Sequence, residues 1–488
     1  MLRLYVLFAI HNTSSSKNTH SQTQVLSHVN FGEKSLISKE MKSWQGPSIL
    51  IYNDSTFTES DFRNIARIGQ GSKMASLEKT GRFGLGFCSS YHWTDVVSFV
   101  SGCSFCVFDP HLKYIPNTQE PGLRVNFCKN TKLREQFKDQ FDPYCIFGND
   151  MKHSFKGTLF RFPIRNASHR SEISDRYFTS KEIRSLLQNK FRNAIQDTLV
   201  FLRNVESIEV FEQTSMTESM KLLYRASARG RSSVKEREEW NRIPSYIAGS
   251  RERFESRDFQ TKEQLYSNLA STPGHALPMS HLEVTMELED DKNNKSSKTY
   301  MICQFLGAGK ARAMAVDPKN FALKLLPLAG IAARISSDDN DDTSGKVFTF
   351  LPLPFKSGLP VHVNGMFTLS SNRRDLWLDA QGMEGVGKTR ALWNQRLLSD
   401  VVAPTYVWTL RIMKEKLGFT KEFLDLIPCE TLREPWNLVA DRTLSLLKNE
   451  RILQTEFSKK WVCRIYLQFI LEHTHTQTHT HSNTGKTT

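Results

Sequence analysis

The sequence predicts an α+β protein in which helices cover a mixed β-sheet, followed by a second mixed α/β region. Three observations support this fold class. A short apolar run at 48–52 leads through turn residues into a helix start at Thr58. An aromatic strand at 157–164 precedes a long segment, 181–202, whose apolar residues repeat with a helical period. Strand-like stretches and polar loops then alternate before a helical C-terminal part.

Length and composition indicate a globular protein of several domains. The chain has 488 residues, 39% of them apolar and 24% charged, which suits two or three packed cores. We expect a poorly ordered lead-in at 1–40, a first domain at 41–205, a second domain at 206–450 that ends in helices, and a low-complexity His/Thr tail at 451–488.

The charge balance permits a polyanionic partner without requiring one. Lys and Arg number 65 against 51 Asp and Glu, a net charge of +14. In 250–263, however, basic and acidic residues are interleaved, which is typical of a solvated, salt-bridged surface. Nucleic acid is therefore an unlikely partner.

No segment predicts insertion into a membrane. The chain lacks the roughly 18 to 20 uninterrupted apolar residues that span a bilayer. The apolar stretch 1–10 is not followed by a small-residue cleavage site, so we do not predict a signal peptide. We expect a soluble, cytoplasmic protein.

The eight cysteines have no regular spacing, which favours a reducing compartment over a disulfide framework. Cys103 and Cys106 form a C-x-x-C pair, but no second pair with zinc spacing follows. A metal or redox site remains the alternative to the simpler interpretation, two small residues in a strand.

The first domain is expected to begin near Trp44, with a strand at 48–52, a turn at 53–55 and a helix from Thr58. A glycine-rich segment, 81–86, should lead into a helix at 87–91 and strands within 96–107. The aromatic strand, the long helix and a strand at 208–211 follow.

The second domain should contain polar loops at 290–298 and 336–345 and a helical part at 389–447. Four histidines in the tail are spaced by Thr and Gln. Such a tract can bind metal, but a tail without chemistry is the simpler interpretation, because nothing positions the ligands. These histidines are His473, His475, His479 and His481.

The glycine-rich segment suggests a phosphate-binding turn. Glycines allow the backbone to approach a ligand closely, and the free amides at a helix start favour anions. Gly81, Gly84 and Gly86 could provide that geometry, although a simple tight turn is an equally good explanation of the glycines alone.

Several short motifs together resemble the repeats of the sacsin family. They occur in the family's order over about residues 41–450: 44–47 (WQGP), 52–54 (YND), 81–87 (GRFGLGF) with 91–92 and 94–95, 157–163 (GTLFRFP), 350–354 (FLPLP), 358–365 (GLPVHVNG) and 372–377 (NRRDLW). Such repeats belong to the GHKL superfamily. The resemblance implies the Bergerat-type fold, a helix-covered mixed sheet that holds ATP under a mobile lid.

The resemblance also implies a set of cofactor-binding residues. Asn53 and Asp54 lie near the position that reads the adenine amino group, and Thr158 matches the threonine at the floor of the adenine pocket. The lid and phosphate contacts would come from Ser72, Lys73, Gly81, Arg82, Phe83, Gly84, Leu85 and Gly86. Taken singly, Asp54 could be a turn cap and Arg82 part of a surface ion pair.

Two departures from the family pattern weaken the expected chemistry. The adenine motif normally has glycines where this chain has Ser55 and Phe57. The family's first helix carries a Glu followed four residues later by Asn, for activating water and holding magnesium, and no such pair precedes Trp44, since Glu33 and Glu40 lack the partner. We therefore predict no catalytic residues and no protein metal site, weak ATP binding, and Mg²⁺ only together with ATP.

A second phosphate motif is present at 382–389 (GMEGVGKT), which matches the P-loop pattern. A P-loop should follow a buried apolar strand, but 373–380 is rich in charge. Its alternative is a solvated loop before a helix. Arg373 and Arg374 could reach a terminal phosphate, as a middle-region arginine does in related heat-shock chaperones, or form a structural salt bridge.

By resemblance, the function is that of a chaperone or co-chaperone module that works with heat-shock chaperones and client proteins in folding or quality control. Two alternatives stay open. One is a scaffold that keeps the fold for interaction only, and the other is a P-loop NTPase that uses Lys388 and Thr389.

Overall fold

The structure, a computed structural model, divides into two compact units. The first comprises Met1–Ser232, Thr285–Lys298 and Phe350–Pro352, and the second comprises Ser233–Val284, Thr299–Thr349 and Leu353–Thr488. The structure describes residues 21–66, 85–115, 118–130, 132–252, 260–337, 344–370, 374–378, 383–428, 432–454 and 461–462.

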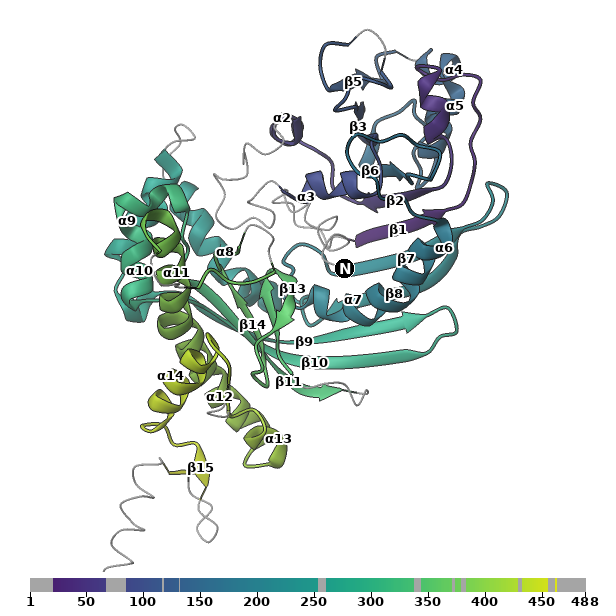
Figure 1. Ribbon diagram of the computed structural model, residues 1–488. Helices are drawn as coiled ribbons and strands as arrows, with labels where there is room; N and C mark the ends of the chain where they lie inside the picture. Colours follow the sequence, from purple (N-terminus) through teal and green to yellow (C-terminus); the bar gives the residue numbers. More distant parts are fainter. Residues whose placement is uncertain are drawn as a thin grey trace, which may run out of the picture. The chain divides into compact units, whose positions relative to one another are not determined.

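The first unit is built on a mixed sheet with the strand order β8-β7-β1-β2-β6-β3-β4-β5 (Figure 1). All of these neighbours pair antiparallel except β1 and β7, which are parallel. The strands are β1 Ser21–Ser27, β2 Ser48–Asn53, β3 Val97–Gly102, β4 Ser104–Phe108, β5 Gly122–Asn126, β6 Phe155–Pro163, β7 Ser207–Gln213 and β8 Lys221–Arg229.

Strand β1 overturns the prediction of a poorly ordered lead-in for residues 21–40. It pairs with both β2 and β7, and all of its residues after Ser21 are buried. The strand was missed because only Val25 and Leu26 among its residues are apolar, yet Gln22 and Gln24 are buried as well. The fold thus begins earlier in the sequence than Trp44, which ends the short helix η2, Glu40–Trp44.

The two faces of this sheet differ. Directly paired residues on neighbouring strands point to the same face. One face contributes Val25, Leu50, Leu159 and Val100 to a buried cluster that also holds Trp44. The opposite face carries the aromatic side chains and polar groups considered below.

Helices of the first unit agree with several predicted positions. The segment predicted at 181–202 is helical from 180 to 199 as α6 Ser180–Ser185, the π-helix η6 Leu186–Phe191 and α7 Arg192–Leu199. Thr179 begins it with a capping box to Glu182. The others are α2 Glu59–Ala66, α3 Leu85–Cys88, η4 Ser89–His92, α4 Leu133–Gln136, α5 Lys138–Phe141 and η5 Asp142–Tyr144.

The second unit also combines a mixed sheet with helices. Its strand order is β13-β12-β14-β11-β10-β9, and β12 is parallel to β14. The strands are β9 Met279–Asp290, β10 Lys295–Leu306, β11 Leu328–Ser337, β12 Lys346–Thr349, β13 Leu351–Lys356 and β14 His362–Gly365. β9 and β10 form a hairpin whose tip belongs to the first unit.

This hairpin corrects the polar loop predicted at 290–298. Only the tip is a turn, because Asp290 ends β9 and Lys295 begins β10. The carboxylate of Asp290 accepts the backbone N–H groups of Lys292 and Asn294, each at 3.0 Å. The predicted loop was therefore too long, because it included the first residues of β10.

The helical C-terminal part is confirmed, although it begins a few residues earlier than predicted. Strands β15 Leu453–Gln454 and β16 Trp461–Val462 pair within the predicted tail, and its histidines lie outside the described residues. The helices of this unit are α8 Val234–Glu252, α9 Gln260–Ser271, η7 Gly274–Ala276, α10 Gly309–Val316, η8 Pro318–Leu323, α11 Gly385–Leu397, the π-helix η9 Leu398–Val402, α12 Ala403–Leu417, α13 Lys421–Leu424 and α14 Asn437–Leu447.

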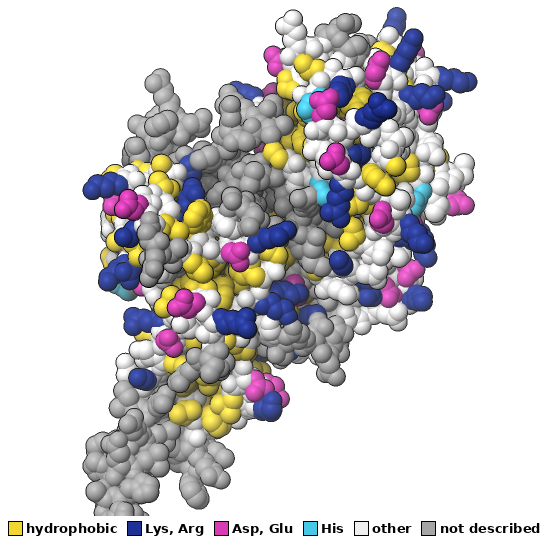
Figure 2. Space-filling view, in the orientation of Figure 1, with side chains coloured by type: hydrophobic (Ala, Val, Ile, Leu, Met, Phe, Trp, Pro, Cys, Tyr) yellow, Lys and Arg dark blue, Asp and Glu magenta, His cyan; other side chains and the backbone are white. Residues whose placement is uncertain are grey.

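Two surface features bear on the predicted partners. Among the described residues, none of the helices has both the length and the apolar character needed to cross a membrane. On the face shown in Figure 2, basic and acidic side chains are intermixed. That mixture is the pattern expected of a solvated surface.

Candidate functional site

The candidate site of the first unit lies where three neighbouring strands each place a polar residue on the same face of the sheet. Asn53 on β2 pairs with Thr158 on β6, and Thr158 pairs in turn with Ser101 on β3. Their exposed fractions are 7%, 0% and 1%. Buried polar side chains need hydrogen-bond partners, so this polar row is a costly feature unless its members are satisfied.

The hydroxyl groups of the polar row form a continuous chain of hydrogen bonds. The backbone N–H of Phe57 donates to Ser101 Oγ at 2.8 Å, and Ser101 Oγ lies 2.7 Å from Thr158 Oγ1. Thr158 donates onward to the carbonyl oxygen of Ser55 at 2.8 Å. Ser101 Oγ also lies 3.2 Å from the carbonyl oxygen of Gly157, to which it donates. The chain fixes the turn after β2 against β3 and β6.

Asn53 and Asp54 have different roles at this turn. Asn53 Oδ1 accepts the backbone N–H of Ser55 at 3.0 Å, so Asn53 forms the Asx turn considered for Asp54. Asp54 is half-buried, and its Oδ2 accepts the backbone N–H of Ser21, the first residue of β1, at 3.2 Å. The carboxylate therefore lies between the ends of β1 and β2.

Gly157 allows the close approach of β6 and β2 beside Thr158. A Cβ atom at position 157 would lie 2.6 Å from the Tyr52 ring and 2.7 Å from the carbonyl oxygen of Asn53. Any larger residue would push the strands apart, and the polar row would lose its register. Gly157 belongs to one of the motifs that resemble the sacsin family, but the resemblance assigned it no role.

An aromatic wall adjoins the polar row on the same face. The Phe57 ring lies 5.0 Å from Phe99 and 5.2 Å from Phe62, and Phe99 lies 4.8 Å from Phe160, measured between ring centroids. All four rings are at most 9% exposed, so the wall is a packed apolar layer beside the polar row.

The structure brings together Asn53, Asp54 and Thr158 from the predicted set. Leu85 and Gly86 lie in α3, which begins within the glycine-rich segment and continues as η4 to His92. The remaining predicted residues, Ser72, Lys73, Gly81, Arg82, Phe83 and Gly84, lie outside the described residues.

A buried ion pair holds the end of the α3–η4 segment. Arg165 and Asp95 are 1% and 5% exposed, and Arg165 Nε donates to Asp95 Oδ1 at 2.7 Å. The same guanidinium donates to the carbonyl oxygens of Tyr91, His92 and Arg176 at 2.9, 3.2 and 3.0 Å. Sequence reasoning missed Arg165, although an arginine directly after an apolar strand was an available signal.

The P-loop match at 382–389 does not have the expected context. Helix α11 begins at Gly385, so its last five residues are helical, and Lys388 is exposed. The hydroxyl of Thr389 donates to the carbonyl oxygen of Gly385 at 3.2 Å. Strand β14 ends at Gly365, and the described residues between it and α11 contain only an isolated bridge.

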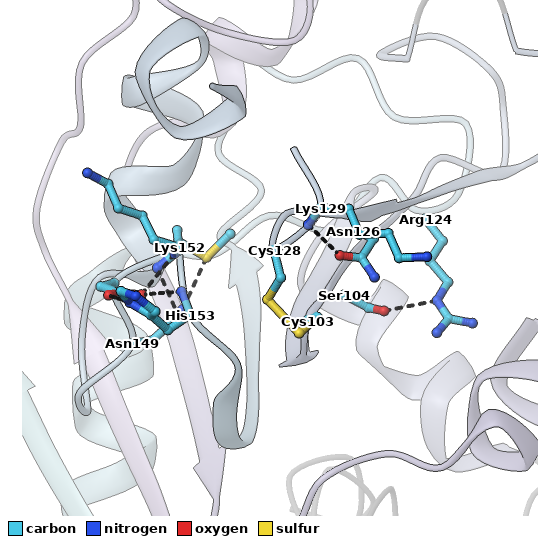
Figure 3. Close-up of a disulfide and its surroundings, with 11 residues drawn as sticks. Cys103, Ser104, Arg124, Asn126, Cys128, Lys129, Asn149, Lys152 and His153 are labelled. Carbon is cyan, nitrogen blue, oxygen red and sulfur yellow. Dashed lines mark hydrogen bonds and ion pairs between the residues drawn. A yellow bond between two sulfur atoms is a disulfide. The ribbon is translucent and has the colours of Figure 1, made fainter. Parts of the chain in front are cut away.

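The C-x-x-C pair proves to be two unrelated cysteines. Cys103 lies in the turn between β3 and β4 and forms a disulfide with Cys128, whereas Cys106 is buried in β4 (Figure 3). The interpretation of both cysteines as small residues in a strand was therefore wrong for Cys103, which lies in a turn and is bonded to Cys128. The cysteine spacing did not indicate this disulfide, because Cys128 lies 25 residues further along the chain, just beyond the end of β5.

Comparisons with known proteins agree with the motif resemblance. A family model described as "Sacsin domain" matches residues 17–225, starting just before β1. Human sacsin is 34% identical over 381 residues, which cover 76% of this chain. The matched region spans 8% of the length of human sacsin, a far longer protein.

Proposed function

Because the chain carries a sacsin-type region, we propose that it is a chaperone or co-chaperone module with a GHKL-type nucleotide pocket in its first unit. The observation that supports the pocket best is the polar row of Asn53, Thr158 and Ser101 beside the aromatic wall. It places fixed polar groups next to an apolar surface, as a purine requires.

In this proposal, the Asp54 carboxylate accepts a hydrogen bond from the exocyclic amino group of adenine. Thr158 and Asn53 hold the turn that carries Asp54, and the buried aromatic wall packs behind the polar row. The glycine-rich segment and Lys73 face the phosphates, whose negative charge suits backbone amides and an ammonium group. Magnesium would enter only with ATP and would neutralise part of the phosphate charge.

Hydrolysis should be weak or absent. Of the two candidate carboxylates before Trp44, Glu33 is exposed and forms an ion pair with Lys42 at 2.9 Å. Glu40 is also exposed and lies in η2. Neither has an asparagine four residues later, so the described part of the chain offers no water-activating pair.

The proposed partners are heat-shock chaperones and client proteins, in the cytoplasm. This part of the proposal rests on the similarity to human sacsin, and the matched region covers 8% of the length of that protein. Nucleic acid is not a proposed partner, because the visible surface mixes both signs of charge.

An interaction scaffold without nucleotide is the second candidate. One observation favours it: the hydroxyl groups of Ser101 and Thr158 already bond within the protein. Hydroxyl groups whose hydrogen bonds are already satisfied need no ligand, and in the scaffold their role is to fix the turn after β2. The P-loop NTPase is the weakest candidate, because residues 385–389 of its motif are helical and the described residues between β14 and α11 include no strand beyond an isolated bridge.

Calorimetric titration of the full chain with ATP, with and without Mg²⁺, tests these candidates. We expect saturable binding that Gly84→Asp abolishes by charge repulsion and that Asp54→Ala weakens about tenfold or more, since a hydrogen bond to a charged group contributes about 1.5–3 kcal/mol. The matched control Lys388→Ala should bind like wild type. Absence of saturable binding would favour the scaffold, and loss only in Lys388→Ala would favour the P-loop.

A further inference from the structure

We propose that the Cys103–Cys128 disulfide is a thiol–disulfide exchange site whose oxidation state controls the order of the polar row. The site takes low-molecular-weight thiols and disulfides of the glutathione type as its substrates. Its effect on nucleotide binding rests on the proposed function, whereas its effect on the polar row does not.

The disulfide closes the end of the β4–β5 strand pair. Ser104 of β4 pairs directly with Asn126 of β5. Cys103 precedes Ser104, Cys128 lies just beyond Asn126, and the Cα atoms of the two cysteines are 5.4 Å apart. The backbone N–H of Phe127 also donates to the carbonyl oxygen of Cys103 at 3.0 Å. The covalent bond therefore joins the β3–β4 turn to the edge strand β5.

This cysteine pair is more accessible than the buried thiols of the described chain. Cys103 and Cys128 are both partly exposed, while burial raises the pKa of Cys106 and of Cys303 to about 12. Exchange proceeds through a thiolate that the attacking reagent can reach, so buried thiols of high pKa react slowly.

Lys129 follows Cys128 directly in the sequence and is exposed. Its backbone N–H donates to Asn126 Oδ1 at 3.0 Å, so the turn that carries Cys128 is held to the end of β5 (Figure 3).

Two peptide bonds separate Cys103 from Ser101 of the polar row. Ser101, Gly102 and Cys103 are consecutive, and the pairing of β3 with β6 shifts register between Ser101 and Gly102. Gly102 has a φ of +56° and lies close to Thr56 of the turn after β2. A change in the position of Cys103 thus acts on Ser101, which holds the Phe57 amide.

The exchange step balances as follows. A reagent thiolate attacks one sulfur of the disulfide, so the S–S bond breaks, a mixed disulfide forms and the other cysteine leaves as a thiolate that takes a proton. A second reagent thiol then attacks the mixed disulfide and releases the remaining cysteine. The two cysteines gain two electrons and two protons, and two reagent thiols become one reagent disulfide.

The first experiment measures the oxidation state directly. The full chain is equilibrated in reduced and oxidised glutathione at several ratios, quenched with acid, alkylated and analysed by peptide mass spectrometry. We expect a reversible transition in which Cys103 and Cys128 change together while Cys106 and Cys303 stay reduced. Free thiols at every ratio, or a disulfide that persists at every ratio, would overturn the proposal.

The second experiment measures the coupling by hydrogen exchange at the Phe57 amide. Reduction, or the Cys128→Ser variant, should speed its exchange about fivefold or more because the turn holding Ser101 loosens. The matched control Cys145→Ser should not change exchange at this amide. Equal exchange in both oxidation states would refute the coupling, even if the disulfide itself is reversible.

ATP titration of both oxidation states separates this proposal from the proposed function. If both hold, reduction weakens ATP binding about threefold or more, as expected of an energetic coupling between two sites. If ATP binds neither state while exchange at Phe57 still depends on the disulfide, the nucleotide proposal fails and the redox proposal stands.

Discussion

Replacement of Arg165 by methionine should destabilise the first unit more than any surface substitution. Arg165→Met keeps much of the side-chain volume but leaves Asp95 buried without its cation. The carbonyl oxygens of Tyr91, His92 and Arg176 also lose their guanidinium donor. Removal of one partner from a buried ion pair costs about 3–5 kcal/mol, because the remaining charge is desolvated and uncompensated.

That loss is large against the stability of a typical domain, about 5–15 kcal/mol. The assay is urea denaturation of the full chain, combined with hydrogen exchange of residues 85–95 to assign the change to the α3–η4 segment. A matched control is Arg225→Met, which breaks an ion pair with Glu209 in the same unit at a site 47% exposed. Exposed pairs contribute about 0–1 kcal/mol, so this control should change little.

The double variant Arg165→Met/Asp95→Leu provides a further check. Removal of both charges should recover part of the lost stability, because no buried charge then remains without a partner. The reasoning is refuted if Arg165→Met costs less than about 1 kcal/mol, no more than an exposed pair is worth, or if exchange in residues 85–95 is unchanged.

Of three further predictions, two concern positions next to the polar row and one concerns the pH dependence of stability. Gly157→Ala should cost about 1–3 kcal/mol in urea denaturation, since the added methyl group would lie 2.6 Å from the Tyr52 ring; a stability equal to wild type would show that the strands can separate freely. Thr158→Val should cost about 1–3 kcal/mol, because the carbonyl oxygen of Ser55 loses its hydroxyl donor and Ser101 Oγ loses one of its partners, and the exposed control Thr214→Val should be neutral. The backbone N–H groups of Ser35 and Lys34 donate to Asp139 and lower the pKa of its carboxyl group. The ionised carboxylate should therefore stabilise the fold at neutral pH, and this stabilisation should be lost as the pH falls through its folded-state pKa. Asp139→Asn should narrow the difference in unfolding free energy between pH 7 and pH 3, and an unchanged difference would contradict this.

Strands and helices could be predicted from the sequence where their apolar pattern matches the residues that the fold buries. Strands β2 and β6 were predicted because their apolar runs are bounded by turn residues, and both are buried. The long helix at 180–199 was predicted because its apolar period continues through the π-helical segment. Of the candidate site, Asn53, Asp54 and Thr158 were named through the motif resemblance, and the structure places Thr158 within β6 directly beside Asn53 at the end of β2.

Features that depend on contacts between distant residues could not be predicted. Only Val25 and Leu26 of strand β1 are apolar, and its other buried residues are polar, so its sequence alone has no clear strand period. The Cys103–Cys128 pair depends on the register of β4 with β5, which sequence spacing does not encode. Ser101 and Arg165 are ordinary residue types, and only the strand pairing and the nearby carbonyl oxygens reveal their roles.

Photoaffinity labelling with an azido-adenine analogue of ATP tests the central proposal most directly. The full chain is irradiated with the analogue, with and without excess ATP, and the labelled peptides are identified by mass spectrometry. The proposed pocket predicts ATP-protected labelling of peptides from residues 48–66 or 155–163, which carry the turn after β2, the aromatic wall and Thr158. Labelling of residues 383–397 instead, or labelling that excess ATP does not reduce, would contradict a nucleotide pocket at the polar row.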